Sequence, residues 1–290
     1  MHKRILLLKL QGGLGNQLFQ YATAKALSLS HNYKLVIDIS SFKHDPYCRS
    51  SLLKEFNVKA KIISKGFFHD IVTPGNRFYA GIKRLNFLVR YTDSDFKFRK
   101  DLCKKKALFQ YLDGYWQSEL YFNEYKPLMR YELTQGSLFL KEKLKKLGYS
   151  NLASVHIRRL HGTYFTNEGE KVVDDRYGLL SQSYYEKAVS VLRNKDVNIK
   201  FLVFSDDIDW CKKNLTWADC FVSDLGKFTD VEELLLMSGC DHHIIANSTY
   251  SWWGAWLGMG INKIVICPAK PFTDSNLHYQ NYYPATWIQI

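Results

Sequence analysis

An apolar run that leads through a glycine-rich turn into a long helical pattern is the feature that most constrains the fold of this chain. Residues 5–10 are apolar except for Lys9, and Gly12 and Gly13 follow. Apolar residues then recur at helical spacing over residues 16–31, and residues 34–39 form a second apolar run. Short, nearly continuous apolar runs are typical of parallel strands that are buried on both faces. The chain therefore begins with strand, turn, helix and strand, as doubly wound α/β folds do.

The same alternation is predicted in the rest of the chain. Strands are predicted at 107–115, 153–158, 200–205, 243–246 and 263–267. Helices are predicted at 117–124, 136–147, 183–193, 207–214 and 248–259, with a further helix that starts at the capping box Thr229-Asp-Val-Glu232 and runs to residue 239. We therefore predict an α/β protein with two doubly wound Rossmann-type domains, residues 1–148 and 149–290, that face a central cleft.

The charge balance favours anionic partners. With 40 basic and 28 acidic residues among 290, the net charge is +12. The basic residues cluster at 104–106 and at Lys141, Lys143, Lys145 and Lys146. Such runs are either solvated helix faces or a patch that holds the protein at an anionic membrane. Because no nucleic-acid-binding motif accompanies the charge, a nucleic-acid partner is not expected.

The cysteines and the beginning of the sequence bear on the compartment. The six cysteines show no CxxC and no Cys/His metal spacing, and they are typical of free thiols in a reducing compartment. The apolar run after Met-His-Lys-Arg holds only four residues before Lys9, which is too short for a signal peptide or a membrane span. We expect a cytoplasmic protein, with peripheral contact at the inner face of the membrane as one interpretation.

The glycine turn is the first candidate binding element. Gly13, Gly15, Asn16 and Gln17 lie where a strand gives way to a helix, and the N–H groups at a helix N-terminus favour an anion. Asp38, at the end of the second strand, is where an NAD-binding protein places its ribose ligand. However, the third glycine of a dinucleotide-binding loop is missing. An NAD-dependent oxidoreductase and a purely structural turn both remain alternatives.

Polar residues also follow three predicted strands of the second half. His156 and Arg158 share one face of their strand, and an arginine at a strand end can bind a diphosphate. Asp206 and Asp207 follow the next strand, where capping of a helix by Ser205 or Asp206 is the main structural alternative. The third segment contains Asn247, Ser248 and Thr249, whose amide and hydroxyls at a helix N-terminus suit a phosphate.

A formal metal motif is set aside. Asp93-Ser-Asp95 has the DxD pattern of metal-dependent sugar transferases, but it lies in an irregular basic stretch that does not follow an apolar strand. We therefore do not predict a metal site at this pair, and no cofactor is expected.

Five segments, taken together, resemble glycosyltransferase family 11, the α-1,2-fucosyltransferases. They occur in family order along almost the whole chain and read GGLGNQLFQYA (12–22), GYWQSE (114–119), VHIRR (155–159), FSDD (204–207) and NSTYSWWGAWL (247–257). The resemblance implies a GT-B fold, GDP-fucose as the donor, inversion at the anomeric carbon and no metal requirement. The expected acceptor is the 2-hydroxyl of a terminal galactose on an oligosaccharide or surface glycan.

The resemblance also implies roles for individual residues. Arg158 would bind the donor diphosphate as the catalytic arginine, His156 would lie beside the nucleoside, and Asp207 would accept hydrogen bonds from guanine. Ser248 and Thr249 would lie near the phosphates. The remaining predicted donor contacts are Gly13, Gly15, Asn16, Gln17 and Asn247.

Two points stay open after the resemblance. In the family pattern HxRRGDY, glycine and aspartate follow the second arginine. Here Arg159 is followed by Leu160 and His161, so any role of the family's aspartate carboxylate is in doubt. The general base is also undecided, with Asp38 and Glu119 as the first candidates and His44 or Asp45 after them. A non-catalytic glycan-binding protein is the remaining alternative, and the polar residues at four separate strand ends argue against it.

Overall fold

The computed structural model describes residues 4–64, 87–93, 95–135, 137–160, 163–165, 171–173, 178–274 and 277–290. The chain divides into two compact units, each with its own parallel sheet. Unit 1 comprises Met1–Glu132 with Asn276–Tyr282, and unit 2 comprises Leu133–Ser275 with Tyr283–Ile290. The domain ranges 1–148 and 149–290 stay a prediction.

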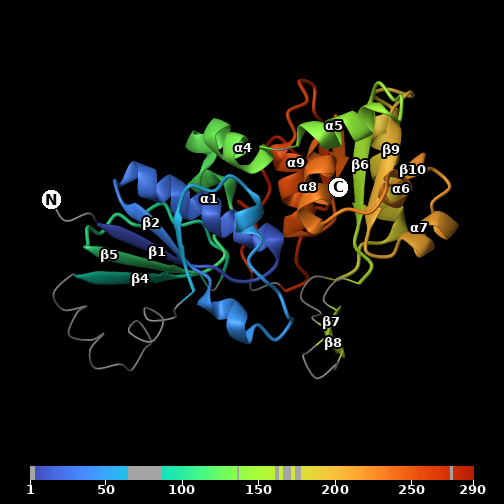
Figure 1. The fold of residues 1–290 in the computed structure, drawn as a ribbon. Coiled ribbons are helices and arrows are strands. Elements are labelled where there is room, and N and C mark those ends of the chain that lie inside the picture. Colours follow the sequence, from blue (N-terminus) through green and yellow to red (C-terminus); the bar gives the residue numbers. More distant parts are fainter. Residues whose placement is uncertain are drawn as a thin grey trace. The chain divides into compact units, whose positions relative to one another are not determined.

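Unit 1 contains a five-stranded sheet in the order β3-β2-β1-β5-β4, with every neighbouring pair parallel. Its strands are β1 (Ile5–Lys9), β2 (Lys34–Asp38), β3 (Lys61–Ile63), β4 (Leu88–Thr92) and β5 (Phe109–Asp113). Helix α1 (Leu14–Ser30) packs against β1 and β2, as Figure 1 shows. The strand order reverses between β1 and β5, so the turn after β1 lies at the switch point of this sheet, where open α/β sheets bind ligands.

The turn between β1 and α1 requires a glycine. Gly12 has φ +82°, and a Cβ at this position would lie 3.0 Å from Nδ2 of Asn16 and 3.3 Å from the ring of Tyr115. Further along unit 1, the chain forms 3₁₀ turns at Ser40–His44, Leu53–Glu55, Glu119–Tyr121 and Asn123–Tyr125. Helix α4 (Lys126–Thr134) follows and spans the division between the units.

Unit 2 contains a six-stranded sheet in the order β10-β9-β6-β11-β12-β13, again parallel throughout. The strands are β6 (Leu152–Ile157), β9 (Lys200–Ser205), β10 (Cys220–Phe221), β11 (His242–Ile244), β12 (Val265–Cys267) and β13 (Ile288–Gln289). Numbered within the unit, this is the order 3-2-1-4-5-6 of a dinucleotide-binding fold. A short antiparallel pair, β7 (Thr163–Phe165) and β8 (Lys171–Val173), lies outside the sheet.

Helices cover both faces of the unit 2 sheet. Helices α6 (Gln182–Arg193) and α7 (Ile208–Asn214) pack on the face that carries Val155, Val203 and Ile244. On the opposite face, α8 (Asp230–Ser238) packs against α9 (Thr249–Leu257), and α5 (Leu138–Lys145) packs against α8. Among the described residues, no helix is long and apolar enough to cross a membrane.

The predicted fold class is confirmed: both units are α/β with parallel sheets, the Rossmann-like pair of a GT-B fold. The capping box at Thr229 is also confirmed, because its hydroxyl accepts the Glu232 N–H and the Glu232 carboxylate accepts the Thr229 N–H. The helix predicted at 117–124 is wrong in type, since this segment forms two 3₁₀ turns. Six short strands and α4 had no sequence prediction.

Candidate active site

Three neighbouring strands of unit 2 carry the predicted donor-binding residues at their carboxyl ends. The strand order places β6 between β9 and β11, and the order reverses between β6 and β11. Arg158 follows β6, Asp206 and Asp207 follow β9, and Ser248 lies shortly after β11. Because all three strands are parallel, these segments meet at one edge of the sheet.

Asp206 holds Arg158 and the backbone that follows it. The Nε of Arg158 lies 3.2 Å from Oδ2 of Asp206. The same carboxylate accepts the backbone N–H of Arg159 at 2.8 Å and that of Leu160 at 3.2 Å. The sequence motif contained Asp206, but nothing in the sequence marked it as the partner of Arg158. The strand register supplies this, since Ile157 pairs with Ser205 and the next residues are Arg158 and Asp206.

His156 lies on β6, two residues before Arg158, and is buried. Its ring centroid is 5.6 Å from that of Tyr250, in the first turn of α9. Burial raises the pKa of Tyr250 well above its ordinary value, the nearby Glu233 and Asp230 raise it further, and Arg158 lowers it. The Tyr250 hydroxyl donates to the Asp230 carbonyl at 2.7 Å. The neutral ring of Tyr250 therefore links α9 to α8 beside the predicted diphosphate arginine.

Asp207 is the N-cap of α7. Its Oδ1 accepts the Trp210 N–H at 3.1 Å, and the Ser205 hydroxyl accepts the Asp207 N–H at 3.0 Å. The predicted capping alternative, Ser205 or Asp206, was therefore wrong by one or two positions. The second carboxylate oxygen, Oδ2, lies 3.8 Å from Nε of Arg159, whose guanidinium lies 3.8 Å from the centroid of the Trp210 ring. Asp207 therefore caps the helix with one oxygen, while the other lies near the Arg159 guanidinium at the strand end.

The first turn of α9 carries the third group of predicted residues. Ser248 is the N-cap and accepts the Tyr250 N–H at 3.3 Å, and Thr249 is the first helical residue. Asn247 is buried and donates from Nδ2 to the Gly178 carbonyl at 3.1 Å. The segment that leads into this turn is held by α6, because the Tyr184 hydroxyl donates to the Ile245 carbonyl at 2.7 Å. Ser248 and Thr249 are half-buried at the positive end of this helix.

The tryptophans of the same motif belong to the core. Trp252, Trp253 and Trp256 are at most 1% exposed, and their ring centroids lie 5.1–6.0 Å apart. Gly254 allows the close approach of α9 to α8, since a Cβ there would clash with the Met237 side chain. The motif therefore combines a polar first turn with a buried aromatic body.

The glycine turn of unit 1 is held by side-chain amides. Gly13 is the N-cap of α1, and a Cβ there would have no heavy atom within 4 Å. The Oδ1 of Asn16 accepts from Nε2 of Gln117 at 2.8 Å, which joins the turn to the segment after β5. Gly15 is buried in the first turn of α1.

Gln17 has a structural environment. It is 1% exposed, and its Nε2 donates to the Gly12 carbonyl at 3.0 Å and to the Ser50 carbonyl at 2.9 Å. Its Oε1 accepts the Leu52 N–H at 2.9 Å. This geometry gives no support to the donor contact predicted for Gln17.

A cavity of about 580 Å³ lies beside the carboxyl ends of β1 and β2, within unit 1. Lys9, Gly12, His44, Arg49 and Tyr115 are among its lining residues. Its volume is in the range of small-molecule sites. Its charged lining and its place next to the glycine turn make it a candidate substrate pocket.

The candidate bases differ in their surroundings. Asp38 is 2% exposed, and its Oδ1 accepts the Ser40 N–H at 2.9 Å. Asp45 also lines the cavity; burial raises its pKa, but hydrogen bonds from Arg49 and from backbone N–H groups outweigh burial and hold the pKa below its ordinary value. A weakly basic carboxylate of this kind is a poor proton acceptor. Glu119 is partly exposed at the start of a 3₁₀ turn.

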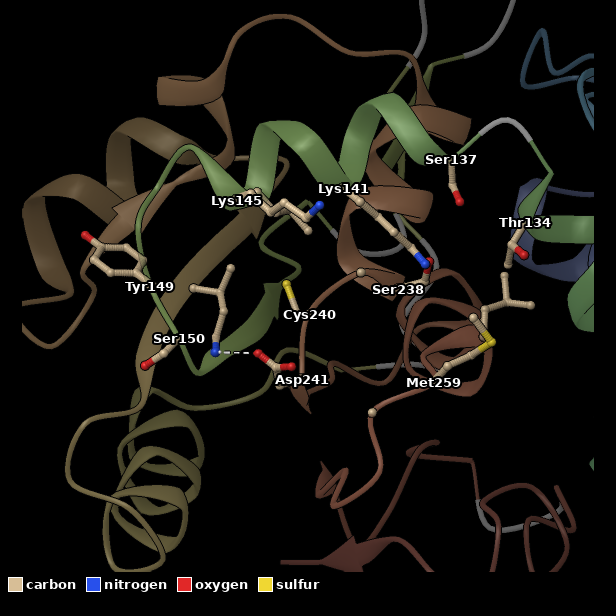
Figure 2. Close-up of a pocket in the computed structure, with 15 residues that line it drawn as sticks. Thr134, Ser137, Lys141, Lys145, Tyr149, Ser150, Ser238, Cys240, Asp241 and Met259 are labelled. Carbon is tan, nitrogen blue, oxygen red and sulfur yellow. Dashed lines mark hydrogen bonds between the residues drawn. The ribbon is translucent and has the colours of Figure 1, made fainter.

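A second cavity, of about 390 Å³, lies in unit 2 at the amino ends of the strands, opposite the strand ends that carry Arg158 and Asp207. Figure 2 shows Lys141 and Lys145 of α5 over it, with Cys240 and Asp241 below. Leu152 and Asp241, at the amino ends of β6 and β11, also line it. The predicted site residues do not line this cavity, so it is separate from the candidate active site.

Asp93 and Asp95, the formal DxD pair, hydrogen-bond to backbone N–H groups. The Asp93 carboxylate accepts from Phe96 and Trp116, and burial raises its pKa. Within the described ranges, no group of three or more His, Cys, Asp and Glu side chains is placed to hold a metal ion. The predicted absence of a metal requirement is a matter for experiment. His161, at the departure from the family pattern, lies outside the described residues.

The chain resembles known proteins along its whole length. The model of glycosyl transferase family 11 matches residues 3–290. An α-1,2-colitosyltransferase of Escherichia coli is 34% identical, with 99% of each chain covered. The O-antigen biosynthesis glycosyltransferase WbnK of the same species is 30% identical, covering 92% of this chain and 95% of WbnK.

The fold has a counterpart among solved structures. A mutant of Arabidopsis thaliana FUT1 in complex with GDP superposes with a TM-score of 0.51 at 12% identity, covering 91% of this chain and 70% of that one. Together with the two parallel sheets and the polar residues at their strand ends, the family match is decisive: this chain belongs to glycosyl transferase family 11 and is a glycosyltransferase.

Proposed function

We propose that the chain is an inverting α-1,2-fucosyltransferase that moves L-fucose from GDP-β-L-fucose to the 2-hydroxyl of a terminal galactose. The observation that carries the proposal is the pairing of Arg158 with Asp206 at the switch point of the unit 2 sheet, where the helix N-terminus of Ser248 and Thr249 follows the neighbouring strand. An arginine and a helix N-terminus at adjacent strand ends are the groups that bind a diphosphate.

The proposed reaction breaks the bond between the anomeric carbon of fucose and the β-phosphate oxygen. The galactose 2-hydroxyl forms the new bond from the opposite face, and this inverts the β linkage to α. Both bonding electrons leave with GDP, so negative charge grows on the β-phosphate. Arg158 and the N–H groups of the first turn of α9 would stabilise that charge, and one such preorganised donor is worth about 10²–10³ in rate.

The nucleotide is proposed to bind along the ends of β6 and β9. His156 would lie beside the nucleoside, and Asp207 would accept from guanine through the oxygen that does not cap α7. Asn247 would act indirectly, because its amide already holds the Gly178 carbonyl. Gly13, Gly15 and Asn16 remain predicted donor contacts.

The acceptor is proposed to bind in the 580 Å³ cavity of unit 1. The acceptor proton needs a base or water as the new bond forms. Asp38 is buried and bonded to the Ser40 N–H, so Glu119 and His44 are the better candidates, and His44 lines the cavity. The cytoplasmic location stays a prediction.

A second donor is favoured by one specific observation. The relative that is 34% identical over almost the whole chain is a colitosyltransferase. Colitose is fucose without the 3-hydroxyl, so a pocket that bonds to this hydroxyl would select fucose. A pocket without such a partner would accept either sugar.

GDP release from GDP-fucose and GDP-colitose, measured with galactose-terminated acceptors in the presence and absence of EDTA, tests the proposal. We expect turnover with GDP-fucose that EDTA leaves unchanged, and a linkage to the galactose 2-hydroxyl in the product. Turnover with GDP-colitose alone would replace the donor. Turnover with neither GDP-sugar, by protein that is folded and binds GDP, would refute the proposed reaction.

A further inference from the structure

The amino ends of the unit 1 strands form a basic edge, defined here as Arg4, Lys34, Lys104, Lys105 and Lys106. Arg4 directly precedes β1, Lys34 begins β2, and the three consecutive lysines precede β5. The register places them together, because Ile5 pairs with Lys34 on one side and with Phe109 on the other. Lys34 and the three consecutive lysines are exposed.

A cavity of about 300 Å³ lies within the basic edge. Arg4, His31, Lys104 and Lys106 are among the residues that line it, and its described lining contains no Asp or Glu. Arg4 is held in place, since its Nη2 donates to the His31 carbonyl at 2.8 Å and its guanidinium lies 4.6 Å from the Tyr33 ring centroid. The edge therefore offers a hollow surrounded by positive charge.

Two large apolar side chains are exposed at the same end of the unit 1 sheet, the end at which β2 and β4 begin. Leu29, in the last turn of α1, is 44% exposed and lies two residues before His31. Phe87 is 48% exposed, and its carbonyl accepts the N–H of Phe109 at the start of β5. Lysines around exposed apolar side chains are the combination found on proteins that bind the interface of an anionic bilayer.

The second lysine cluster, at residues 141–146 in unit 2, is partly engaged by other side chains. On α5, Lys145 pairs with Glu142 at 2.6 Å, and Lys143 lies 5.2 Å from the centroid of the Phe228 ring. Among the ion pairs of the described residues, none involves Lys104, Lys105 or Lys106. The positive charge of the basic edge is therefore the less compensated of the two clusters.

We propose that the basic edge docks the protein on an anionic phospholipid bilayer, with Leu29 and Phe87 at the level of the headgroups. The glycine turn follows the carboxyl end of β1, whereas the basic edge lies at the amino ends of the strands. Docking would therefore leave the substrate-binding end of the unit 1 sheet away from the lipid. The proposal does not depend on which sugar is transferred.

Co-sedimentation with vesicles tests the proposal. The probes are vesicles of phosphatidylcholine alone and of phosphatidylcholine mixed with phosphatidylglycerol. We expect the wild-type protein to bind only the mixed vesicles, with binding that falls as salt rises. Each lysine near such a surface contributes a factor of about five in binding, so K104Q/K105Q/K106Q should lower vesicle affinity by roughly 100-fold.

A charge-matched variant controls for net charge. K187Q/K195Q/K213Q removes three exposed lysines of unit 2 and should retain vesicle binding. Equal losses in the two triple variants would overturn the basic edge as the docking surface. Leu29→Ser should weaken binding at high salt, where the apolar contribution remains.

Two further measurements complete the test. The rate of GDP release in solution, without vesicles, should be the same for K104Q/K105Q/K106Q as for wild type, which would show that the variant is folded. Binding to a short RNA that survives at a salt concentration where vesicle binding is lost would overturn the proposal in favour of a nucleic-acid surface.

Discussion

Arg158 and Asp206 form an ion pair across the ends of two neighbouring parallel strands, with 3.2 Å between Nε and Oδ2. The same carboxylate binds the next two backbone N–H groups, so it fixes both the guanidinium and the chain that leaves β6. A preorganised arginine stabilises a transition state without the cost of reorienting during the reaction. The pair is therefore the first target for mutation.

Arg158→Ala should lower kcat by about 10²–10³, because it removes the cation proposed to face the leaving β-phosphate. Arg158→Lys should restore little activity, since an ammonium lacks the planar fork of donors. Steady-state GDP release measures both variants, with Arg193→Ala, at an exposed position of α6, as the control. Near-normal turnover in Arg158→Ala would contradict the assignment.

Asp206→Asn should act through Arg158. The amide keeps an acceptor for a backbone N–H but loses the charge of the ion pair with Arg158, so we expect kcat to fall by roughly tenfold. In the Arg158→Ala background the same change should have little further effect. If the two losses multiply instead, Asp206 has a role that is independent of Arg158.

Asp207→Asn separates helix capping from nucleotide recognition. Asn caps a helix about as well as Asp, so stability should change little, whereas Asp207→Ala should cost about 1 kcal/mol. If the carboxylate accepts from guanine, both variants should bind GDP at least about tenfold more weakly and discriminate less against ADP. Calorimetry of GDP and ADP binding gives the answer. Unchanged GDP affinity in Asp207→Asn would leave capping as its role.

Gln17→Leu should destabilise the fold without removing a donor contact. It leaves the Gly12 and Ser50 carbonyls and the Leu52 N–H without the amide they bond to, and we expect a loss of about 2–4 kcal/mol in the free energy of unfolding. Gln182→Leu, at an exposed position of α6, should change stability by less than about 0.5 kcal/mol. Denaturant titration measures both. A folded Gln17→Leu variant with wild-type stability and impaired GDP-fucose binding would restore the donor role.

His243 should make the protein sensitive to acid. Burial lowers the pKa of His243 well below its ordinary value, and Lys263 and His242 lower it further. The unfolded chain takes up a proton near pH 6.5, whereas the native state does not. Stability from this group is therefore complete above about pH 6.5 and falls by up to about 1.4 kcal/mol per pH unit below it.

Unfolding of the wild type and of His243→Gln by guanidinium at neutral and mildly acidic pH measures this effect. The variant should show a smaller loss on acidification, even if it is less stable at neutral pH. His278→Gln, at an exposed position, should keep the wild-type slope. An equal slope in all three proteins would contradict the prediction.

The sequence predicted the elements that are long or strongly patterned. Helix α1, the capped helix α8 and strands β1, β2, β6 and β9 all lie within one or two residues of their predicted bounds. The strands without a prediction have two to five residues and lie outside the apolar runs that marked the other strands. Strands β11 and β12 are as short, but they overlap the mainly apolar runs 243–246 and 263–267. The segment at 117–124 has helix-forming residues, but the local hydrogen bonds close 3₁₀ turns.

Part of the candidate site depends on register, which the sequence does not encode locally. The motifs placed Arg158 and Ser248 at strand ends, but only the pairing of β6 with β9 puts Asp206 against Arg158. In the same way, the 3₁₀ turn at Ser40–His44 and the residues that follow it as far as Arg49 form one wall of the unit 1 cavity only through tertiary packing. Gln17 was predicted to contact the donor because the sequence at the start of a helix does not show whether a side chain there is buried.

The aromatic body of α9 has a consequence for measurement. Four indoles lie in one contact group behind the Ser248–Thr249 turn, because Trp287 also packs 5.4 Å from Trp252, centroid to centroid. Closely spaced, rigid indoles couple their electronic transitions. The chain thus carries an intrinsic optical reporter on the helix proposed to hold the phosphates, and occupancy of that helix end should be readable from near-ultraviolet circular dichroism without any label.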